Sequence, residues 1–153
     1  MMTIAIPSSA TAWTASAGSN GAVDCSGARI RAHCRHLATV VTIRGEIDSV
    51  NVDAVNEHIQ RFIINGQNPV VLDMSDVSRV SGAGIWLVHR FDEECCLAGV
   101  EWTLIASPAI IELLGDAAPM FPLARSVHEA LHSLADAIVS RRQRVLPLIR
   151  KTA

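Results

Sequence analysis

The chain has 153 residues, half of them hydrophobic, and a formal net charge of −2 at pH 7. Its longest apolar runs are shorter than the ~18 residues of a membrane-spanning helix, which argues against an integral membrane segment. The last five basic residues all follow the last acidic residue. The rest of the chain therefore holds eight basic against fifteen acidic residues. Such an acidic body is not suited to nucleic-acid binding.

The composition divides the chain into three parts. Residues 1–27 are rich in Ala, Ser, Gly and Thr, which predicts a flexible N-terminal leader, and no basic residue precedes its first apolar positions as a secretory signal would require. Residues 28–138 are expected to form the folded domain. Residues 139–153 form a basic C-terminal tail, which could be a solvated helix end or could contact an acidic partner or a membrane surface.

The first predicted elements are two strands within residues 28–46, joined by a tight connection. The second strand is rich in β-branched residues and should end where Gly45 interrupts it. A helix follows, capped by Asp48 or Ser49 and continuing to about Ile64, because apolar residues recur there at helical spacing.

The later elements alternate between strands and helices. In chain order they are a buried strand at 70–74, a turn at 78–84, a helix at 84–98, a strand at 100–106, a short helix opened by Ser107 and Pro108, an edge strand at 120–123, and a helix from Ser126 that stops by Pro147. Strands that alternate with helices pair in parallel, and the opening hairpin adds an antiparallel pair. The predicted fold is therefore α/β, with a mixed, mostly parallel sheet of four to five strands and four to five helices.

The motifs of common enzymes are missing from the sequence. The four cysteines form no CxxC pair and the six histidines no HExxH pattern, so we expect no metal, and a reduced, cytoplasmic protein is the default. Neither a GxxxxGK[ST] loop nor a GxSxG elbow occurs. We therefore expect no cofactor and no catalytic residues.

Two loops between strands and helices are the candidate functional sites. They are "RGEIDSVN" (44–51) and "DMSDVSRVSGAGIW" (73–86). A helix start exposes unpaired N–H groups that favour an anion, and Gly82 and Gly84 let another backbone come close. An equally physical alternative is that Ser81 only caps the helix and the glycines only permit the turn.

These residues resemble the STAS family, whose soluble single-domain members are bacterial anti-anti-sigma factors. The resemblance covers roughly residues 28–135 and depends on two ordered landmarks. They are Gly45-Glu46-Ile47-Asp48, and Asp73-Met74-Ser75-Asp76-Val77 followed by Ser81-Gly82-Ala83-Gly84-Ile85. The resemblance implies a non-enzymatic switch that binds a kinase-like anti-sigma factor, frees the sigma factor, and is turned off when the same kinase phosphorylates a serine. A homodimer is compatible with this role.

The chain departs from the family pattern at the switch itself. The family's phosphoacceptor serine aligns with Gly82, the next hydroxyl with Ala83, and the preceding aspartate with Ser81. Three explanations stay open: the protein is permanently competent to bind, Ser81 takes the phosphate, or control moves elsewhere, for instance to thiol oxidation at Cys95, Cys96 or Cys34.

The predicted partner surface joins both loops to the exposed face of the following helix. Trp86 is its candidate anchor, because a large ring opposite the apolar face needs a reason to be there. The full set is Asp48, Ser49, Ser78, Ser81, Gly82, Ala83, Gly84, Trp86, His89 and Arg90.

Two other functions fit the same fold. The chain could be a STAS subunit or accessory domain of a transport or stress-sensing assembly, with the basic tail as a contact. It could instead be a module that binds a nucleotide or lipid at the helix start.

Overall fold

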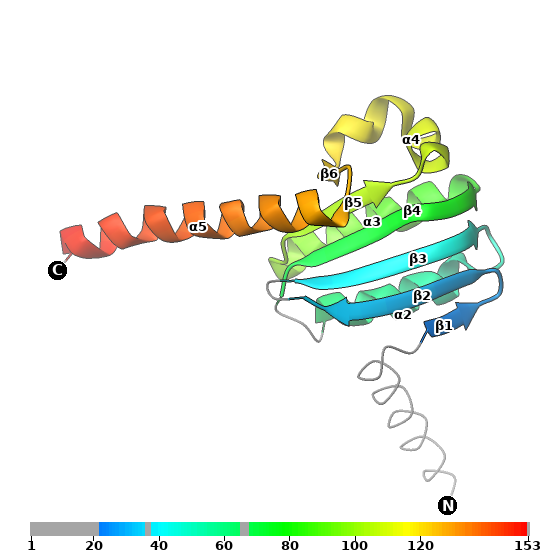
Figure 1. Cartoon of the computed structure of the whole chain (residues 1–153), viewed down its shortest axis with the longest axis horizontal. Helices are drawn as coiled ribbons and strands as arrows, with labels where there is room; N and C mark the ends of the chain where they lie inside the picture. Colours follow the sequence, from blue (N-terminus) through cyan, green and yellow to red (C-terminus); the bar gives the residue numbers. More distant parts are fainter. Residues whose placement is uncertain (1–21, 36–37, 65–67, 153) are drawn as a thin grey trace, which may run out of the picture.

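The computed structural model describes residues 22–35, 38–64 and 68–152. Its centre is a six-stranded sheet in the order β1-β2-β3-β4-β5-β6 (Figure 1). The first three strands pair antiparallel, and β3 to β6 pair in parallel. The strands are β1 Ala22–Cys25, β2 Ala28–Cys34, β3 Thr39–Ile47, β4 Val70–Val80, β5 Trp102–Ala106 and β6 Leu123–Ala124.

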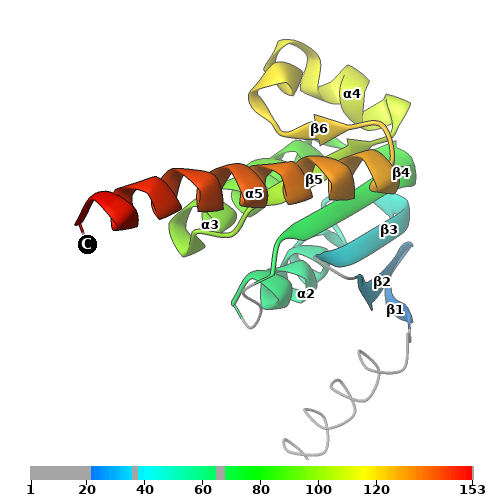
Figure 2. The ribbon, with the colours of Figure 1, turned by 60° about the vertical axis from the view of Figure 1, so that its left-hand side comes forward.

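The helices cover the two faces of the sheet unequally. Helices α2 and α3 lie on one face, and α5 lies across the other, as two views agree (Figures 1 and 2). The short helix α4 packs against α3 and β4 and is followed by a 3-10 helix, η2. The helices are α2 Val52–Ile64, α3 Gly82–Ala98, α4 Pro108–Leu114, η2 Gly115–Met120 and α5 Val127–Thr152.

The main core lies between the sheet and the layer of α2, α3 and α4. The predicted apolar face of α3, with Leu87, Val88, Phe91 and Cys95, is buried in it. Burial of each such large side chain contributes ~1.5–3 kcal/mol to folding. The α/β class and the mixed sheet are therefore confirmed, with a strand count higher than predicted.

A second, smaller core lies on the opposite face, under the first half of α5. Ala130 and Leu134 of this helix are buried against Val71 of β4 and Ile105 of β5. This layer covers one side of the sheet face and leaves β1, β2 and the end of β3 uncovered (Figure 2).

The prediction of a flexible leader over residues 1–27 is wrong for its last residues. Strand β1 occupies Ala22–Cys25 and pairs with β2 through a turn at Ser26 and Gly27. Cys25 is in the main core and Val23 packs against it, so alternating burial makes this segment part of the sheet despite its loop-like composition. Residues 1–21 of the predicted leader lie outside the described residues.

Gly45 does not end its strand. Strand β3 continues to Ile47, with register shifts beside Gly45, whose φ of +103° suits a bulge. A side chain there would collide with the Gly27 carbonyl oxygen. The residue therefore permits a close approach of two strands within the sheet.

Three other boundaries differ from the predictions. Strand β4 extends to Val80, so α3 begins at Gly82 rather than Gly84. The segment predicted as an edge strand is mostly η2, with only Leu123–Ala124 in β6. Helix α5 continues past Pro147, although a proline there removes one hydrogen bond of the helix.

Candidate functional site

The loop between β3 and α2 is held in place by two side chains. Asp48 Oδ1 accepts hydrogen bonds from the backbone N–H groups of Val50 (2.9 Å) and Asn51 (3.1 Å). Asn51 is buried, and its Nδ2 donates to the carbonyl oxygens of Glu46 (2.8 Å) and Ser26 (3.2 Å). Its Oδ1 accepts from the Asp48 N–H (3.0 Å). The side chain of Asn51 therefore joins the β1–β2 turn, the end of β3 and the start of α2.

The second loop is the direct passage from β4 into α3. The Ser81 N–H donates to the Ile47 carbonyl oxygen (3.0 Å), and its Oγ accepts from the Ala83 N–H (3.3 Å), so Ser81 caps the helix. Ser78 Oγ donates to the Gly45 carbonyl oxygen (3.1 Å). These bonds tie the ends of β3 and β4 to one another and set the two loops side by side.

The two glycines of this loop have opposite surroundings. A Cβ at Gly82 would have no atom within 4 Å, and Gly82 is exposed. Gly84 is buried, and a Cβ there would collide with the side chain of Val80. Gly84 therefore lets α3 pack closely on β4, and its contact with a partner stays a prediction.

A groove lies beside these strand ends and has a volume of about 650 Å³. It is bounded by the ends of β3 and β4 and by one side of α4. Its lining is Glu46, Ile47, Asp48, Arg79, Val80, Ser81, Ala109, Glu112 and Leu113. We call this feature the strand-end groove.

The charges of the strand-end groove are mostly negative. Glu46, Asp48 and Glu112 contribute carboxylates, and Arg79 is the basic residue of the lining. Arg79 forms a long ion pair with Glu46, Nη1 to Oε1 3.9 Å, on exposed side chains. Such a pair contributes little to stability and leaves the arginine free to exchange partners.

The predicted residues on α3 lie apart from this groove and do not line it. Trp86 is 45% exposed, which is compatible with an anchor at a protein interface. Arg90 pairs with Glu94 one turn later, Nε to Oε1 3.4 Å. His89 packs its ring against Phe121, with ring centroids 5.0 Å apart, so it stabilises the contact of α3 with the segment after α4.

The two cysteines considered for redox control differ in exposure. Cys95 is 1% exposed, and burial, reinforced by Asp92 and Glu94, raises the pKa of its thiol to about 12. The thiolate is the reactive form, so Cys95 is unsuited to a redox switch at neutral pH. Cys96 is exposed, as is Cys34.

The described part of the chain lacks two other kinds of feature. No group of three or more His, Cys, Asp and Glu side chains is arranged there to hold a metal ion. None of the described helices combines the length and apolarity needed to cross a membrane.

Several residues of the strand-end groove were not predicted from the sequence. Glu46, Ile47 and Arg79 lie within the two candidate loops but were not named among the partner-binding residues. Glu112 and Leu113 come from α4, which carries no motif. Val50, 80% exposed beside Ser49, is a further apolar contact point that its position in the loop could have indicated.

Comparison with known proteins identifies the family. The model of the STAS domain matches residues 29–130. The chain belongs to the STAS family. A STAS relative from Mycobacterium tuberculosis, "Osmosensory protein A", is 55% identical over 159 residues, covering 99% of this chain and all of that protein.

Solved structures with the same fold include other STAS proteins. An anti-sigma factor antagonist from Mycobacterium paratuberculosis aligns with a TM-score of 0.59 and 23% identity, covering 69% of this chain and 92% of that one. A variant of RsbS from Moorella thermoacetica gives 0.61 and 18%, covering 71% and 97%. At these identities the likeness shows the STAS fold, as the family resemblance had predicted.

Proposed function

We propose that this STAS protein is an anti-sigma factor antagonist, which binds a kinase-like anti-sigma factor at the strand-end groove and thereby frees a sigma factor. Support comes from the family and from structural neighbours that carry this description. The role needs no catalysis, so we assign no enzymatic step. Because sigma factors act in the cytoplasm, we place the protein there.

The observation that carries the proposal is the exposed position of Gly82, which directly follows the groove residue Ser81. By the family pattern this is where the phosphoacceptor serine stands, yet Gly82 offers no hydroxyl and no side chain. A phosphate of nearly −2 charge therefore cannot be added at this position to repel the partner. We infer that the surface stays competent to bind.

Ser81 is the alternative acceptor, and its geometry disfavours it. Its Oγ already accepts from the Ala83 N–H as the cap of α3. A phosphate there would lie at the N-terminus of a helix, where the helix dipole stabilises negative charge. We therefore expect phosphorylation of Ser81 to weaken partner binding less than phosphorylation of a serine at position 82 would.

The charge of the groove indicates what its partner presents. Three carboxylates face one arginine, so a docking segment with basic and apolar residues would be complementary. Val50 and Trp86 flank this region as exposed apolar contacts. The name of the relative from Mycobacterium tuberculosis suggests osmotic stress as the signal to which the interaction responds.

The test is a binding screen against the kinase-type anti-sigma factors of the same genome, with and without ATP. We expect one partner to bind equally in both conditions. The variant Ser81→Asp with Gly82→Ser should restore the phosphoacceptor and lose at least about tenfold in affinity, or ~1.4 kcal/mol, when ATP is present. Binding of the unmodified chain that ATP abolishes, with phosphate found on Ser81, would contradict the Gly82 argument.

A pair of charge reversals tests the location of the interface. Glu112→Lys in the groove should weaken partner binding about tenfold, because the new lysine would repel the basic residues of the docking segment. Asp116→Lys is the matched control, since Asp116 is exposed in η2 and outside the lining. Equal affinity for both variants would move the interface away from the groove.

A further inference from the structure

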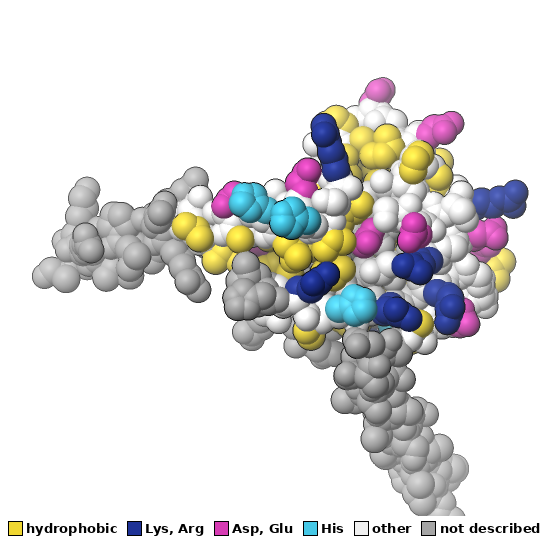
Figure 3. Space-filling model, in the orientation of Figure 1, with side chains coloured by type: hydrophobic (Ala, Val, Ile, Leu, Met, Phe, Trp, Pro, Cys, Tyr) yellow, Lys and Arg dark blue, Asp and Glu magenta, His cyan; other side chains and the backbone are white. Residues whose placement is uncertain are grey.

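The sheet face that carries α5 is covered over only part of its width. Helix α5 packs on β4, β5 and β6, while none of the described helices lies over β1, β2 and the end of β3 on this side (Figure 2). The side chains of this uncovered area are charged rather than apolar, and basic groups gather over β2 and β3 (Figure 3). This area is distinct from the strand-end groove and has no role in the proposed function.

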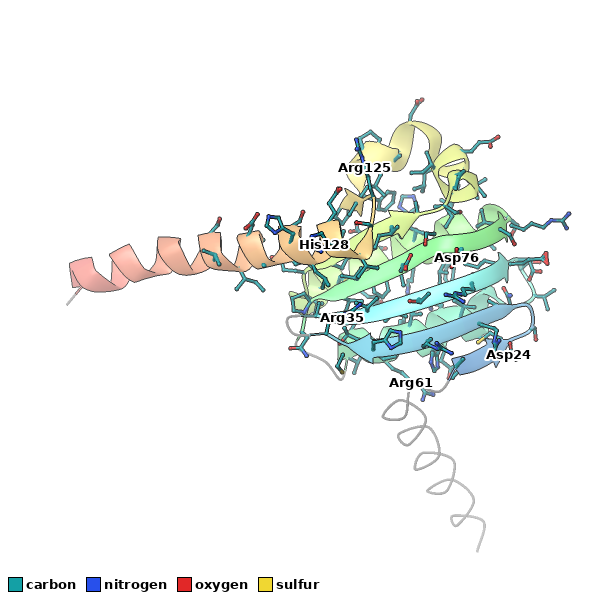
Figure 4. All side chains as sticks on the ribbon, viewed as in Figure 1. Asp24, Arg35, Arg61, Asp76, Arg125 and His128 are labelled. Atoms are coloured by element: carbon teal, nitrogen blue, oxygen red, sulfur yellow. The ribbon has the colours of Figure 1, made fainter. Side chains whose placement is uncertain are left out.

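Strand β2 supplies a basic stripe along this face. Successive side chains of a strand point to opposite faces, and Ala28 and Ile30 are in the core. The opposite face therefore receives Arg29, Arg31 and His33, and Arg35 follows directly after the strand. The stripe spans ~20 Å at ~3.3 Å per residue. Figure 4 labels Arg35 at one end and Asp24 near the other.

One row of side chains across the sheet brings two arginines together. Asp24, Arg29, Arg44 and Asp76 are direct neighbours in register on β1 to β4. Arg29 pairs with Asp24 at 3.9 Å (Nε to Oδ1) and Arg44 with Asp76 at 3.2 Å (Nε to Oδ2). Like charges directly opposite one another destabilise a sheet. An anion placed between Arg29 and Arg44 would relieve that repulsion.

The next row leaves a hollow beside these arginines. Arg31 has Ala22 and Thr42 as its neighbours in register and forms no ion pair among the described residues. The short side chain of Ala22 leaves a cavity of about 80 Å³, more than twice the ~30 Å³ share of a water molecule. Its lining is Ala22, Arg29, Arg31, His33, Thr42 and Arg44.

We propose that this face binds an acidic polypeptide segment of a partner protein, with one carboxylate in the hollow between Arg29, Arg31 and Arg44. Guanidinium groups form strong, directional hydrogen bonds with carboxylates, and the hydroxyl of Thr42 supplies a further donor. The length of the stripe suits several acidic side chains in succession. Charge complementarity therefore identifies the occupant.

Two other polyanionic surfaces fit less well. Asp24 and Asp76 border the arginines and would repel a continuous phosphate backbone. Single-stranded nucleic acids stack their bases on large aromatic rings, and the Phe and Trp rings of the described residues belong to the helices, to β5 and to Phe121. The large exposed hydrophobic residues that could enter a membrane also lie outside β1, β2 and β3.

The test measures binding of a fluorescein-labelled peptide of alternating Glu and Ala, about eight residues long to match the stripe. We expect the full-length protein to bind it at low salt and more weakly as salt screens the charges. Arg31→Glu should weaken binding at least about tenfold, and Arg31→Gln less. Arg125→Glu is the matched control, because Arg125 lies near β6, away from the stripe (Figure 4).

Circular dichroism would first establish that each variant is folded. Peptide binding by the unmodified chain that depends on Arg31 and not on Arg125 supports the proposal. Absence of binding, or equal binding by all variants, overturns it. Arg31-dependent binding of oligouridylate or of phosphatidylglycerol vesicles in place of the peptide also overturns it. Groove variants such as Glu112→Lys should leave peptide binding unchanged, so this result and the anti-sigma screen are independent.

Discussion

Two glycines in the first turn of α3 show how one residue type can serve two purposes. Gly82 is exposed, with open space where a side chain would stand, whereas Gly84 is pressed on Val80. The first determines what the surface offers to a partner, and the second determines how closely the helix approaches the sheet.

This difference gives a prediction about stability. Gly84→Ala should lower the free energy of unfolding by ~1–3 kcal/mol, because the added methyl overpacks the contact with Val80. Gly82→Ala should be neutral or stabilising by up to ~1 kcal/mol, since alanine has the better helix propensity. Urea denaturation measures both. A second change, Val80→Ala, should restore part of the loss in Gly84→Ala, and the absence of any rescue would contradict the overpacking.

A pair of asparagines in and before α2 provides a second test. Asn51→Ala should destabilise the fold by ~2–4 kcal/mol, because the variant loses three hydrogen bonds. The Ser26 and Glu46 carbonyl oxygens and the Asp48 N–H would then lack the partner that Asn51 provides. Asn56→Ala is the control, since the Asn56 Oδ1 is buried without a hydrogen-bond partner in the described residues. We expect this change to be neutral or stabilising in thermal denaturation. Equal losses of stability in the two variants would contradict the role given to the Asn51 hydrogen bonds.

At the scale of an element, α5 determines which part of the sheet face stays uncovered. Its first half is docked by Ala130 and Leu134, and further along, Val139 is already 51% exposed. The helix then continues past the sheet (Figure 1). The position of α5 is therefore the reason that β4 and β5 are covered and β2 is free.

The docking of α5 can be tested with one truncation. Leu134→Ala should cost ~2–4 kcal/mol of unfolding free energy, since it leaves a cavity in the second core. Val139→Ala, on the exposed part of the same helix, should change stability by less than ~0.5 kcal/mol. Hydrogen exchange of α5 amides would locate the effect. If exchange were unchanged in Leu134→Ala, the second core would not be what holds the helix.

At the scale of the whole molecule, two surfaces of different charge lie on different sides. The strand-end groove is mostly acidic and suits a basic partner, while the β2 stripe suits an acidic one. The two linings share no residue, so a charge change in one surface is expected to leave the other intact.

The pH dependence of stability is also a property of the whole molecule. Burial, with Arg61 nearby, lowers the pKa of His58 below its ordinary value near 6.5. Between the lowered pKa of native His58 and the unfolded value near 6.5, the unfolded chain binds more protons than the native protein. The stability of the fold with neutral His58 is therefore fully present above pH ~6.5 and is lost as pH falls toward the native pKa. His58→Gln should flatten the decline of the urea midpoint in this interval. An unchanged slope would assign the decline to other groups.

The secondary structure and the fold class followed from the order of residues. Apolar spacing in α2 and α3, the caps at Ser81 and Ser107, and the two family landmarks depend on residues close in sequence. Such signals survive in the sequence because helix starts and strands are local structures. The boundaries at Gly45 and at β1 were missed, because both are set by pairing between strands.

The sequence by itself determined the α/β class and, through its two ordered landmarks, the membership of the STAS family. Only the tertiary structure decided that Gly84 is buried, that α4 completes the strand-end groove and that the basic stripe faces solvent. Asn51 illustrates the reason, since it bonds to a carbonyl oxygen 25 residues earlier in the chain. Contacts between distant residues arise from packing the elements together, and their energies are not encoded in any short stretch of sequence.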